Sequence, residues 1–309
     1  MSVTSRELLG GRGVADAKRV QTPFRRFVSD YCESKVAIGA FAVLVAIILI
    51  AILAPFISPQ NPYDLGVVDV MDSRMQPGER SMAGFTFWLG SDGAGRDMLS
   101  AIFYGLRTSL GVGVMSGIIA LCIGMTVGLM AAYMGGRTDS IIMRVVDLQL
   151  SFPAILIALI LLAILGKGVD KIIVALVIAQ WAYYARTVRA SALVERRKEY
   201  IEAATCLALS HRRIVFRHLL PNCLPPLIVV GTLQTAHAIS LEATLSFLGV
   251  GLPQTEPSLG LLISNGFEYM LSGKYWISFF PGIALLITIV SINLVGDQLR
   301  DVLNPRLER

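Results

Sequence analysis

The chain has 309 residues, of which 54% are hydrophobic and 16% are charged, and it carries a formal net charge of +5. Soluble domains contain roughly 25% charged residues, so this composition favours a protein embedded in lipid. The basic residues stand between apolar runs and near the N-terminus, without the basic face interleaved with aromatic residues that is typical of nucleic-acid binding. We therefore expect a membrane protein in contact with lipid and without a nucleic-acid partner.

Cysteine and histidine positions argue against a metal site, a disulfide framework or a catalytic centre. The four cysteines include no C-x-x-C pair, and the three histidines lack metal-ligand spacing such as H-E-x-x-H. The sequence has no Walker A phosphate loop and no catalytic constellation either. We expect isolated thiols, no metal, no cofactor bound by this chain and no enzymatic activity in it.

The first predicted membrane helix covers residues 36–57, which are apolar and uncharged. A transmembrane helix needs about 20 mostly apolar residues. The preceding leader, residues 1–35, is too long and too mixed for the charged start of a secretory signal, so we expect an uncleaved anchor. Pro55, Pro59 and Pro62 are expected to end this helix, and a polar segment follows over residues 58–107.

Five further apolar runs predict spans two to six: 108–134, 142–166, 172–185, 224–249 and 275–296. In the second span, Gly113 and Gly117, then Gly124 and Gly128, are four residues apart and place small side chains on one helix face. This spacing allows another helix to approach closely, although glycine is also generally frequent in membrane helices. Pro153 is expected to kink the third span.

Lysine and arginine side chains are concentrated on one side of the six predicted spans. The leader, the loops after spans two and four and the C-terminal tail hold most of them. The other side has only Arg74, Arg80, Arg96, Arg107, Lys167, Lys171 and Lys274. Cytoplasmic loops carry an excess of lysine and arginine. We therefore place both termini in the cytoplasm and residues 58–107 outside it.

A basic segment between spans four and five, residues 199–222, predicts two short cytoplasmic helices. The first starts at Tyr200 and the second is capped by Ser210 and stopped by Pro221. An apolar stripe of small residues runs along the first helix at Ile201, Ala204, Leu207 and Ala208. Either this stripe receives another protein, with Glu202 as an anchor for a partner cation, or the segment is an amphipathic connector lying on anionic lipid.

The same segment resembles the EAA loop of the permease subunits of bacterial ABC importers. The family pattern is E-A-A, then a glycine four residues after the second alanine, then a distant L-P. The matching residues here are Glu202, Ala203, Ala204, Leu220 and Pro221. Ala208 stands at the glycine position, where glycine would permit a turn with positive φ that alanine resists. We expect that the turn is moved, for example to Ser210, or that the two helices meet without a left-handed residue.

Further blocks extend the resemblance over nearly the whole chain after the leader. The stretch "LGSDGAGRDMLSAIFYGLRTSL", residues 89–110, resembles the G-T-D-x-x-G-R-D-x-L-S-R signature of dipeptide, oligopeptide and nickel permeases. Other matching blocks are "AAYMGGRTDSIIMRVVDLQLSFP", "EATLSFLGVGLP" and "NLVGDQLRDVLNPR". Their order and separation make the chain most similar to the dipeptide-type C subunit of such importers.

The resemblance implies an all-α polytopic membrane protein with six transmembrane helices and the type I importer permease fold, in the bacterial inner membrane. It implies a permease core over residues 108–309 that forms half of a translocation pathway for peptides, nickel chelates, glutathione or opine-like solutes. The implied partners are a second homologous permease, two ATPase subunits that hold ATP and Mg, and an extracytoplasmic solute-binding protein. In the family, the EAA loop docks in a groove of the ATPase.

The signature block contains five residues that we expect outside the membrane: Gly90, Asp92, Gly95, Arg96 and Asp97. We expect Asp92 to cap the following helix and Asp97 to lie in its first turn, where the helix dipole favours anions. Arg96 is expected to pair with a carboxylate on the same side. The block either shapes the entrance and meets the binding protein, or it is a purely structural cap.

Glu242 lies within the fifth predicted span, five residues after His237. An intramembrane acid is energetically expensive and usually faces a cavity or a partner. One interpretation makes the two residues a proton relay, as in a secondary transporter or channel. The other gives Glu242 a role in helix packing or gating, since it belongs to the block "EATLSFLG" that resembles the family.

Overall fold

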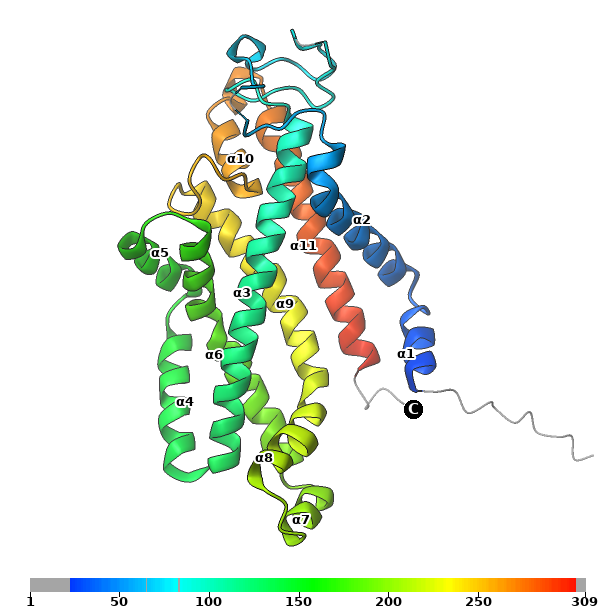
Figure 1. Cartoon of the computed structure of the whole chain (residues 1–309), viewed down its shortest axis with the longest axis vertical. Coiled ribbons are helices and arrows are strands. Elements are labelled where there is room, and N and C mark those ends of the chain that lie inside the picture. Colours follow the sequence, from blue (N-terminus) through cyan, green and yellow to red (C-terminus); the bar gives the residue numbers. More distant parts are fainter. Residues whose placement is uncertain (1–22, 65, 83, 304–309) are drawn as a thin grey trace, which may run out of the picture.

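The computed structural model describes residues 23–64, 66–82 and 84–303, and the regular elements within these ranges are all helical (Figure 1). The long helices are α2 (Lys35–Ile57), α3 (Met98–Met134), α6 (Val169–Glu195), α9 (Leu220–Phe247) and α11 (Trp276–Val302). The shorter α-helices are α1 (Pro23–Tyr31), α4 (Gly136–Ser151), α5 (Ala154–Leu165), α7 (Glu199–Cys206), α8 (His211–Arg213) and α10 (Leu259–Phe267). Two 3₁₀ turns, Val70–Asp72 and Met270–Ser272, and one π-helix, η2 (Ile214–Leu219), complete the list. Most of the predicted leader and the last six residues lie outside the described ranges.

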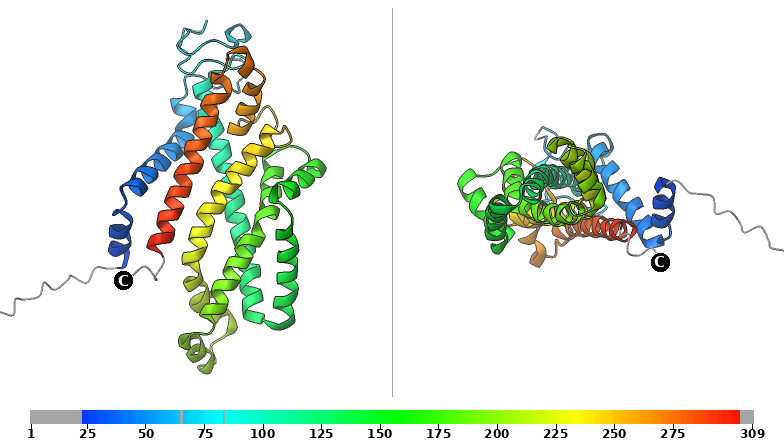
Figure 2. Two further views of the ribbon diagram at one scale, coloured as in Figure 1. Left: turned by 180° about the vertical axis from the view of Figure 1, so that it is seen from behind. Right: turned by 90° about the horizontal axis from the view of Figure 1, so that it is seen from below.

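The long helices form an elongated bundle whose two ends differ. Figure 2 shows α3, α6 and α9 in the middle, with α2 and α11 on one flank and α4 and α5 on the other. The irregular segment of residues 58–97, called here the 58–97 loop, gathers with α10 at one end (Figure 1). Helices α7 and α8 project from the opposite end, and α1 and the C-terminal end of α11 lie toward that end too.

Four helices of the described chain are long and apolar enough to cross a membrane: Lys35–Ile57, Met98–Met134, His211–Phe247 and Trp276–Val302. The bent pair α4 and α5 makes a fifth candidate if it counts as one span. Helix α6 contains the predicted fourth span and has 27 residues, which is long enough to cross a bilayer at about 1.5 Å per residue. Much of α6 is buried against other helices rather than exposed to lipid. Its sequence is less hydrophobic than that of the four helices named above. The structure thus supports four or five spans, and the expectation of six stays a prediction.

Two predicted spans differ in detail from the helices observed. Helix α3 begins at Met98, ten residues before the predicted start at residue 108, because its first three turns are covered by protein and do not need a continuous apolar sequence. The third predicted span is broken rather than kinked, with α4 and α5 bent by 88° around Phe152 and Pro153. The residue before a proline is driven out of the helical region, and Phe152 is extended at φ −98° and ψ 139°.

Glycines of α3 allow unusually close helix contacts in the middle of the bundle. A Cβ atom added at Gly124 would lie 2.4 Å from the Trp181 carbonyl oxygen, and one at Gly128 would lie 2.5 Å from the Ala185 carbonyl oxygen. On the α9 side, a Cβ at Gly113 would lie 2.4 Å from Ile239 Cγ1. These separations confirm the interpretation of the glycine spacing as a face for close helix approach.

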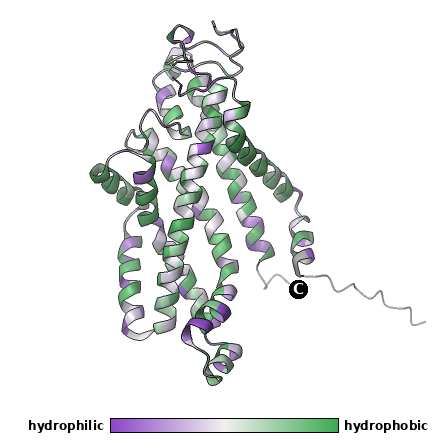
Figure 3. Cartoon of the chain, viewed as in Figure 1, coloured by the Kyte–Doolittle hydropathy of each residue, from purple (hydrophilic) through white to green (hydrophobic). Residues whose placement is uncertain are grey.

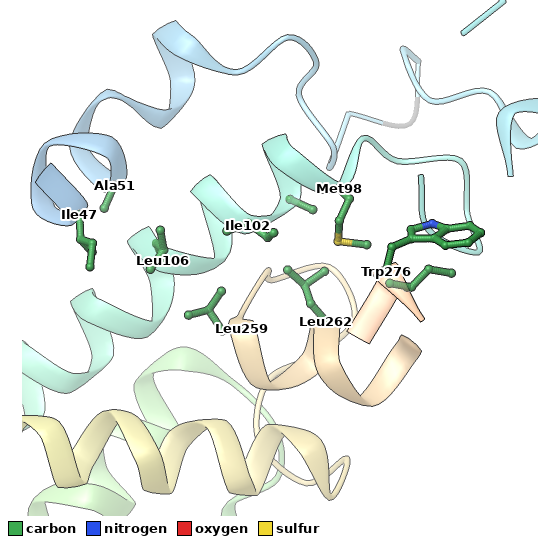
Figure 4. Packing of buried hydrophobic residues seen from close by; sticks show 10 residues of the cluster. Ile47, Ala51, Met98, Ile102, Leu106, Leu259, Leu262 and Trp276 are labelled. Carbon is green, nitrogen blue, oxygen red and sulfur yellow. The ribbon is translucent and has the colours of Figure 1, made fainter. Parts of the chain in front are cut away.

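Apolar packing at the loop end joins four helices in one cluster (Figure 4). Its labelled members are Ile47 and Ala51 of α2, Met98, Ile102 and Leu106 of α3, Leu259 and Leu262 of α10, and Trp276 of α11.

Elsewhere the helices expose apolar side chains. Helix α2 buries its alanines and exposes large side chains such as Ile52 and Phe56. Figure 3 shows α2 and α5 as strongly hydrophobic helices. Exposed apolar helix faces of this extent are typical of contact with lipid or with another membrane subunit.

Candidate functional site

Helices α7 and α8 with the turn between them, residues 199–213, form a projection called here the elbow. Helix α7 ends in a Schellman motif, in which the Leu209 amide donates to the Ala204 carbonyl at 3.2 Å and the Ala208 amide donates to the Thr205 carbonyl at 2.9 Å. Ala208 itself adopts the left-handed conformation at φ 51°. Both expectations for this position were therefore wrong, since the turn is not moved and it does use a left-handed residue. This conformation costs an L-residue roughly 1–2 kcal/mol.

The second helix of the elbow does not stop at Pro221 as predicted. Ser210 is the N-cap of α8 as expected, although its side chain makes no capping hydrogen bond. The chain then continues through the π-helix η2 directly into α9, and the Leu220 amide donates to the carbonyl of Val215, five residues earlier. Pro221 falls in the first turn of α9, where a missing amide hydrogen is tolerated. Leu220 and Pro221 thus form a joint between the elbow and a long helix.

The apolar stripe of α7 is divided between the interior of the elbow and its surface. Ile201 and Ala204 are buried against Ile214 of η2, so this half of the stripe packs the elbow against the chain that follows it and does not face another protein. Leu207 is 75% exposed, and Glu202 and Ala203 are exposed as well. No hydrogen bond or ion pair engages the Glu202 carboxylate within the described part of the chain. The elbow therefore presents a carboxylate and apolar surface away from the bundle.

At the opposite end, neither aspartate of the signature has the role predicted for it. Asp97 is the N-cap of α3, and its Oδ2 accepts bonds from the Ser100 amide at 2.8 Å and the Ser100 hydroxyl at 2.5 Å. Asp92 does not cap a helix. Its Oδ1 accepts from the amides of Ala94 and Arg96 at 2.8 and 2.9 Å, and it therefore folds the turn before the helix. The predicted pairing of Arg96 is observed, since its Nε lies 2.8 Å from Asp92 Oδ2.

The two glycines of the signature are required by space and by backbone conformation. Gly95 has φ 86°, and an added Cβ would lie 2.0 Å from the Asp69 carbonyl oxygen. Gly90 has φ 82°, and an added Cβ would lie 2.7 Å from the Trp276 indole ring. Both positions combine a conformation that side chains resist with the close approach of another segment. The signature is therefore, first of all, a tightly packed fold of the 58–97 loop against α3 and α11.

Sequence analysis missed the buried polar residues that hold this loop in place. The side-chain Oε1 of Gln60 accepts a hydrogen bond from the backbone amide of Asp97 at 2.9 Å, and the backbone amide of Gln60 donates to the Ser100 hydroxyl. Asp72 accepts from the Ser81 hydroxyl at 2.5 Å. These partners are between 9 and 40 residues apart, so no local pattern indicates them. Burial raises the pKa of the Asp97 carboxyl, whose Oδ1 has no hydrogen-bond partner among the described residues.

A polar cavity of about 400 Å³ opens beside the signature block. Asp92 and Arg96 line it from the 58–97 loop, and Asn265, Glu268 and Tyr269 line it from α10 and the residues that follow. The cavity is therefore lined by segments that are far apart in sequence. Its lining mixes both charges with amides, which suits contact with a polar solute or a polar protein surface.

Glu242 is fully buried in α9 and satisfied by serine hydroxyls. Ser109 Oγ of α3 donates to its Oε2 at 2.8 Å, and Ser246 Oγ donates to its Oε1 at 2.7 Å. Ser109 in turn accepts from the Leu259 amide at 3.3 Å, so Glu242 joins three helices. His237 is exposed, and the structure does not bring it together with Glu242. Within the described residues, no group of three or more histidine, cysteine, aspartate or glutamate side chains is placed to hold a metal ion.

Comparison with known proteins gives concordant matches along the chain. Residues 124–309 match the family described as binding-protein-dependent transport system inner membrane component, and residues 22–77 match the N-terminal TM domain of oligopeptide transport permease C. A putative peptide transport system permease of Brucella suis is 42% identical over 86% of each chain. A di/tripeptide transport system permease of Pseudomonas aeruginosa is 33% identical over 93% of each, and a glutathione transport system permease of Pectobacterium atrosepticum is 35% identical over 94% of each.

A solved structure shares the fold. An inward-facing form of the MetNI methionine ABC transporter aligns with a TM-score of 0.56 and 22% identity, and the match covers 67% of this chain and 98% of that one. The match supports the helical arrangement of the bundle, whereas the similarity in sequence over most of the chain comes from the peptide permeases.

Proposed function

The chain belongs to the family of inner membrane components of binding-protein-dependent transport systems, as a permease subunit of an ABC importer, and we propose that it forms half of a translocation pathway for peptides or a related small solute. The cargo class rests on the peptide permeases that resemble it over most of its length. The observation that carries the mechanism is the elbow, whose Glu202 carboxylate and Leu207 side chain face away from the bundle. The carboxylate offers a partner protein a charge with which to form a charge-assisted hydrogen bond.

The pathway is completed by a second, homologous permease, and ATP and Mg bind to two partner ATPase subunits. In this proposal, ATP hydrolysis and its cofactors belong to those subunits and this chain supplies the path and the movement. An extracytoplasmic solute-binding protein delivers the cargo to the end that carries the 58–97 loop. The polar cavity beside Asp92 and Arg96 supports this role, because it offers charged and amide groups at that end.

In the membrane, the chain has six spans and both termini in the cytoplasm, with a leader over residues 1–35, a first span over 36–57, an extracytoplasmic segment over 58–107 and a permease core over 108–309. The excess of lysine and arginine in the leader, in the elbow and in the tail supports this orientation. The arrangement of the helices agrees with it, since α1, the C-terminal end of α11 and the elbow lie toward one end and the 58–97 loop at the other (Figure 1).

Coupling to ATP hydrolysis takes place at the elbow. Glu202 pairs with a cation in a groove of the ATPase, while Leu207 and Ala203 pack beside it. A charge-assisted hydrogen bond in such a site is shorter and stronger than a neutral one. When the two ATPases close on nucleotide, the groove moves and the elbow moves with it, so that the permease shifts between two states that nucleotide biases. Glu242 has a packing role, because its bond from Ser109 holds α9 against α3.

Native cysteines provide a direct test of elbow docking. Cys206 lies at the end of α7 and is exposed, and Cys32 just after α1 is exposed as well. We expect maleimide labelling of Cys206 to slow at least about tenfold when the ATPases join the permease pair, whereas labelling of Cys32 stays unchanged. Equal labelling of Cys206 with and without ATPases would overturn the proposed docking. Solute uptake by this chain without any ATPase would favour the secondary transporter instead.

A further inference from the structure

One side chain of α3, Tyr133, concentrates the contact between the elbow and the bundle. Its hydroxyl lies 2.5 Å from Nδ1 of His211 in α8, and the two rings meet edge to face with centroids 5.6 Å apart. Tyr133 also packs against the apolar cluster that Ile201 and Ala204 of the elbow form with Ile214 of η2. It therefore touches both helices of the elbow from the last turn of α3.

Arg196 fixes Tyr133 from the side of α6. It is the C-cap residue of α6, and its Nη1 donates to the Ala132 carbonyl at 2.9 Å. That carbonyl belongs to the last turn of α3, where backbone acceptors lack partners within the helix. The guanidinium of Arg196 also lies 5.6 Å from the centroid of the Tyr133 ring, an arrangement that attracts a cation to the ring face. The end of α3 is thus held to α6 while its tyrosine holds the elbow.

The chain that connects the elbow to α9 is more flexible than the contact between the elbow and α3. It runs through the π-helix η2, and π-helices are rare and occur mostly as single turns at functional sites. The helix that follows carries Pro225 and Pro226 in its interior, each of which removes one backbone hydrogen bond. An apolar cavity of about 260 Å³ separates η2 from the last turns of α3. The wide π turn, the missing bonds and the adjacent space all allow this joint to bend.

We propose that Tyr133 and His211 are positioning residues that pass movement of the elbow to α3. This proposal rests on the proposed docking of the elbow to the ATPase. Helix α3 has 37 residues and runs from Tyr133 near one end of the molecule to its Asp97 cap under the 58–97 loop at the other (Figure 1). Movement applied at Tyr133 therefore reaches the far end of the bundle along one continuous helix, while the π-helix absorbs the accompanying change in α9.

Removal of one hydroxyl tests the contact in the complete importer, reconstituted with its partner permease, ATPases and binding protein. Tyr133→Phe keeps the ring and its packing but removes the bond to His211. We expect uptake of a radiolabelled dipeptide per ATP hydrolysed to fall roughly two- to tenfold, the range that one hydrogen bond spans. His211→Ala should have a similar effect, and the double variant should be no worse than the stronger single one, because both changes remove the same interaction.

The matched control is Tyr183→Phe, which removes a hydroxyl from an exposed tyrosine of α6 away from the elbow and should leave the ratio unchanged. A merely structural role of Tyr133 would lower assembly, uptake and hydrolysis together and leave uptake per ATP at its original value. If Tyr133→Phe fails to assemble, His211→Ala decides. An unchanged ratio in the assembled variants overturns the proposal.

The outcome also separates this proposal from the docking on which it rests. Protection of Cys206 by the ATPases together with an unchanged ratio would remove only the role of Tyr133. Free labelling of Cys206 in the complete complex would instead remove the docking itself.

Discussion

The 58–97 loop and the elbow are both irregular segments at the ends of the same bundle, yet they are built in opposite ways. The loop buries Asp72, Ser91 and Asp97 with hydrogen-bond partners and seats Gly95 where no side chain fits. The elbow buries only small or aliphatic side chains and keeps its charged groups exposed. One end of the molecule is therefore built to keep its shape.

The elbow has the features of a segment that moves. Ala208 is exposed and holds a strained left-handed conformation, and the π-helix replaces regular α-helix where the elbow joins α9. Segments with few buried contacts open at low free energy. The continuous helix α3 joins the rigid 58–97 loop to the compliant elbow. Movement of the elbow can therefore be passed along α3 to the other end of the bundle.

The largest effect is expected from Gly95→Ala in the 58–97 loop. The new Cβ would lie 2.0 Å from the Asp69 carbonyl oxygen, so the loop has to refold locally. We expect a loss of about 4 kcal/mol or more, which is exceptional for a single substitution, measured as thermal unfolding of the purified complex.

The control for this substitution is Gly78→Ala in the same loop. Gly78 has a similar φ of 92° but nothing within 4 Å of an added Cβ. Its cost should be confined to the backbone conformation, roughly 1–2 kcal/mol. Equal effects of the two substitutions would show that the loop is not packed as tightly as the contrast requires.

At the elbow, the largest effect is expected from Glu202→Lys, and it should fall on coupling rather than on stability. Loss of a buried charge pair at an interface costs at least about 2 kcal/mol, or roughly 30-fold, so uptake should fall by that factor while membrane insertion is unchanged. Glu199→Lys makes the same charge change one turn earlier in α7 and should have a much smaller effect. Unchanged uptake in Glu202→Lys, measured in proteoliposomes, would show that Glu202 is not the anchor.

The same contrast explains how much could be predicted from the sequence. The apolar spans, the two-helix elbow and the glycine face of α3 were predictable because each depends on periodicity within one segment. The pairing of Arg96 with a carboxylate was also predicted, since Asp92 is only four residues away. Local patterns and family blocks were sufficient for these features.

Features that depend on distant segments were missed or misassigned. Asp97 directly precedes α3 and Asp92 lies six residues before it, and the predicted helix start at residue 108 gave no means of choosing between them as the cap. The contact of Gln60 with Asp97 joins segments 37 residues apart. Pro221 was predicted to stop a helix because proline usually does so. The prediction failed because a π-helix precedes the proline, and a π-helix has no sequence signal of its own.

A smaller effect is expected from removing the cap of α3. Asp97→Ala should destabilise the protein by about 0.5–2 kcal/mol, the usual cost of losing an N-cap. Asp97→Asn keeps an acceptor for the Ser100 amide and should be at least as stable as the original at neutral pH. The reason is that burial raises the pKa of Asp97 above its unfolded value, so its ionised form disfavours folding.

The pH dependence gives the sign of this effect. The folded state binds the proton of Asp97 more tightly than the unfolded state does. The stability that this carboxyl contributes is therefore present at low pH and is lost as the pH rises through the raised pKa of the folded state. The Asn variant should lack this component, so the difference in thermal unfolding between Asp97→Asn and the original should shrink toward acid pH. A difference that grows toward acid pH would contradict the buried position of the carboxyl.

The smallest effect is a gain in stability that only the compliant end should show. Ala208→Gly removes the strain of a left-handed alanine, roughly 1–2 kcal/mol, but gives the unfolded chain more freedom, worth about 0.4–1 kcal/mol. We expect a net gain below about 1 kcal/mol, seen as a few-fold slower hydrogen exchange of the elbow amides.

The matched change in the 58–97 loop is Arg74→Gly, at φ 61°. There the strained residue stacks over Tyr269 and its amide donates to the Asp92 carbonyl at 2.9 Å, so removal of the side chain loses a contact and should bring no gain. If both substitutions stabilise equally, strain at Ala208 is no mark of a mobile elbow. If neither does, the left-handed turn is not the weak point of the elbow, and its compliance resides in the π-helix alone.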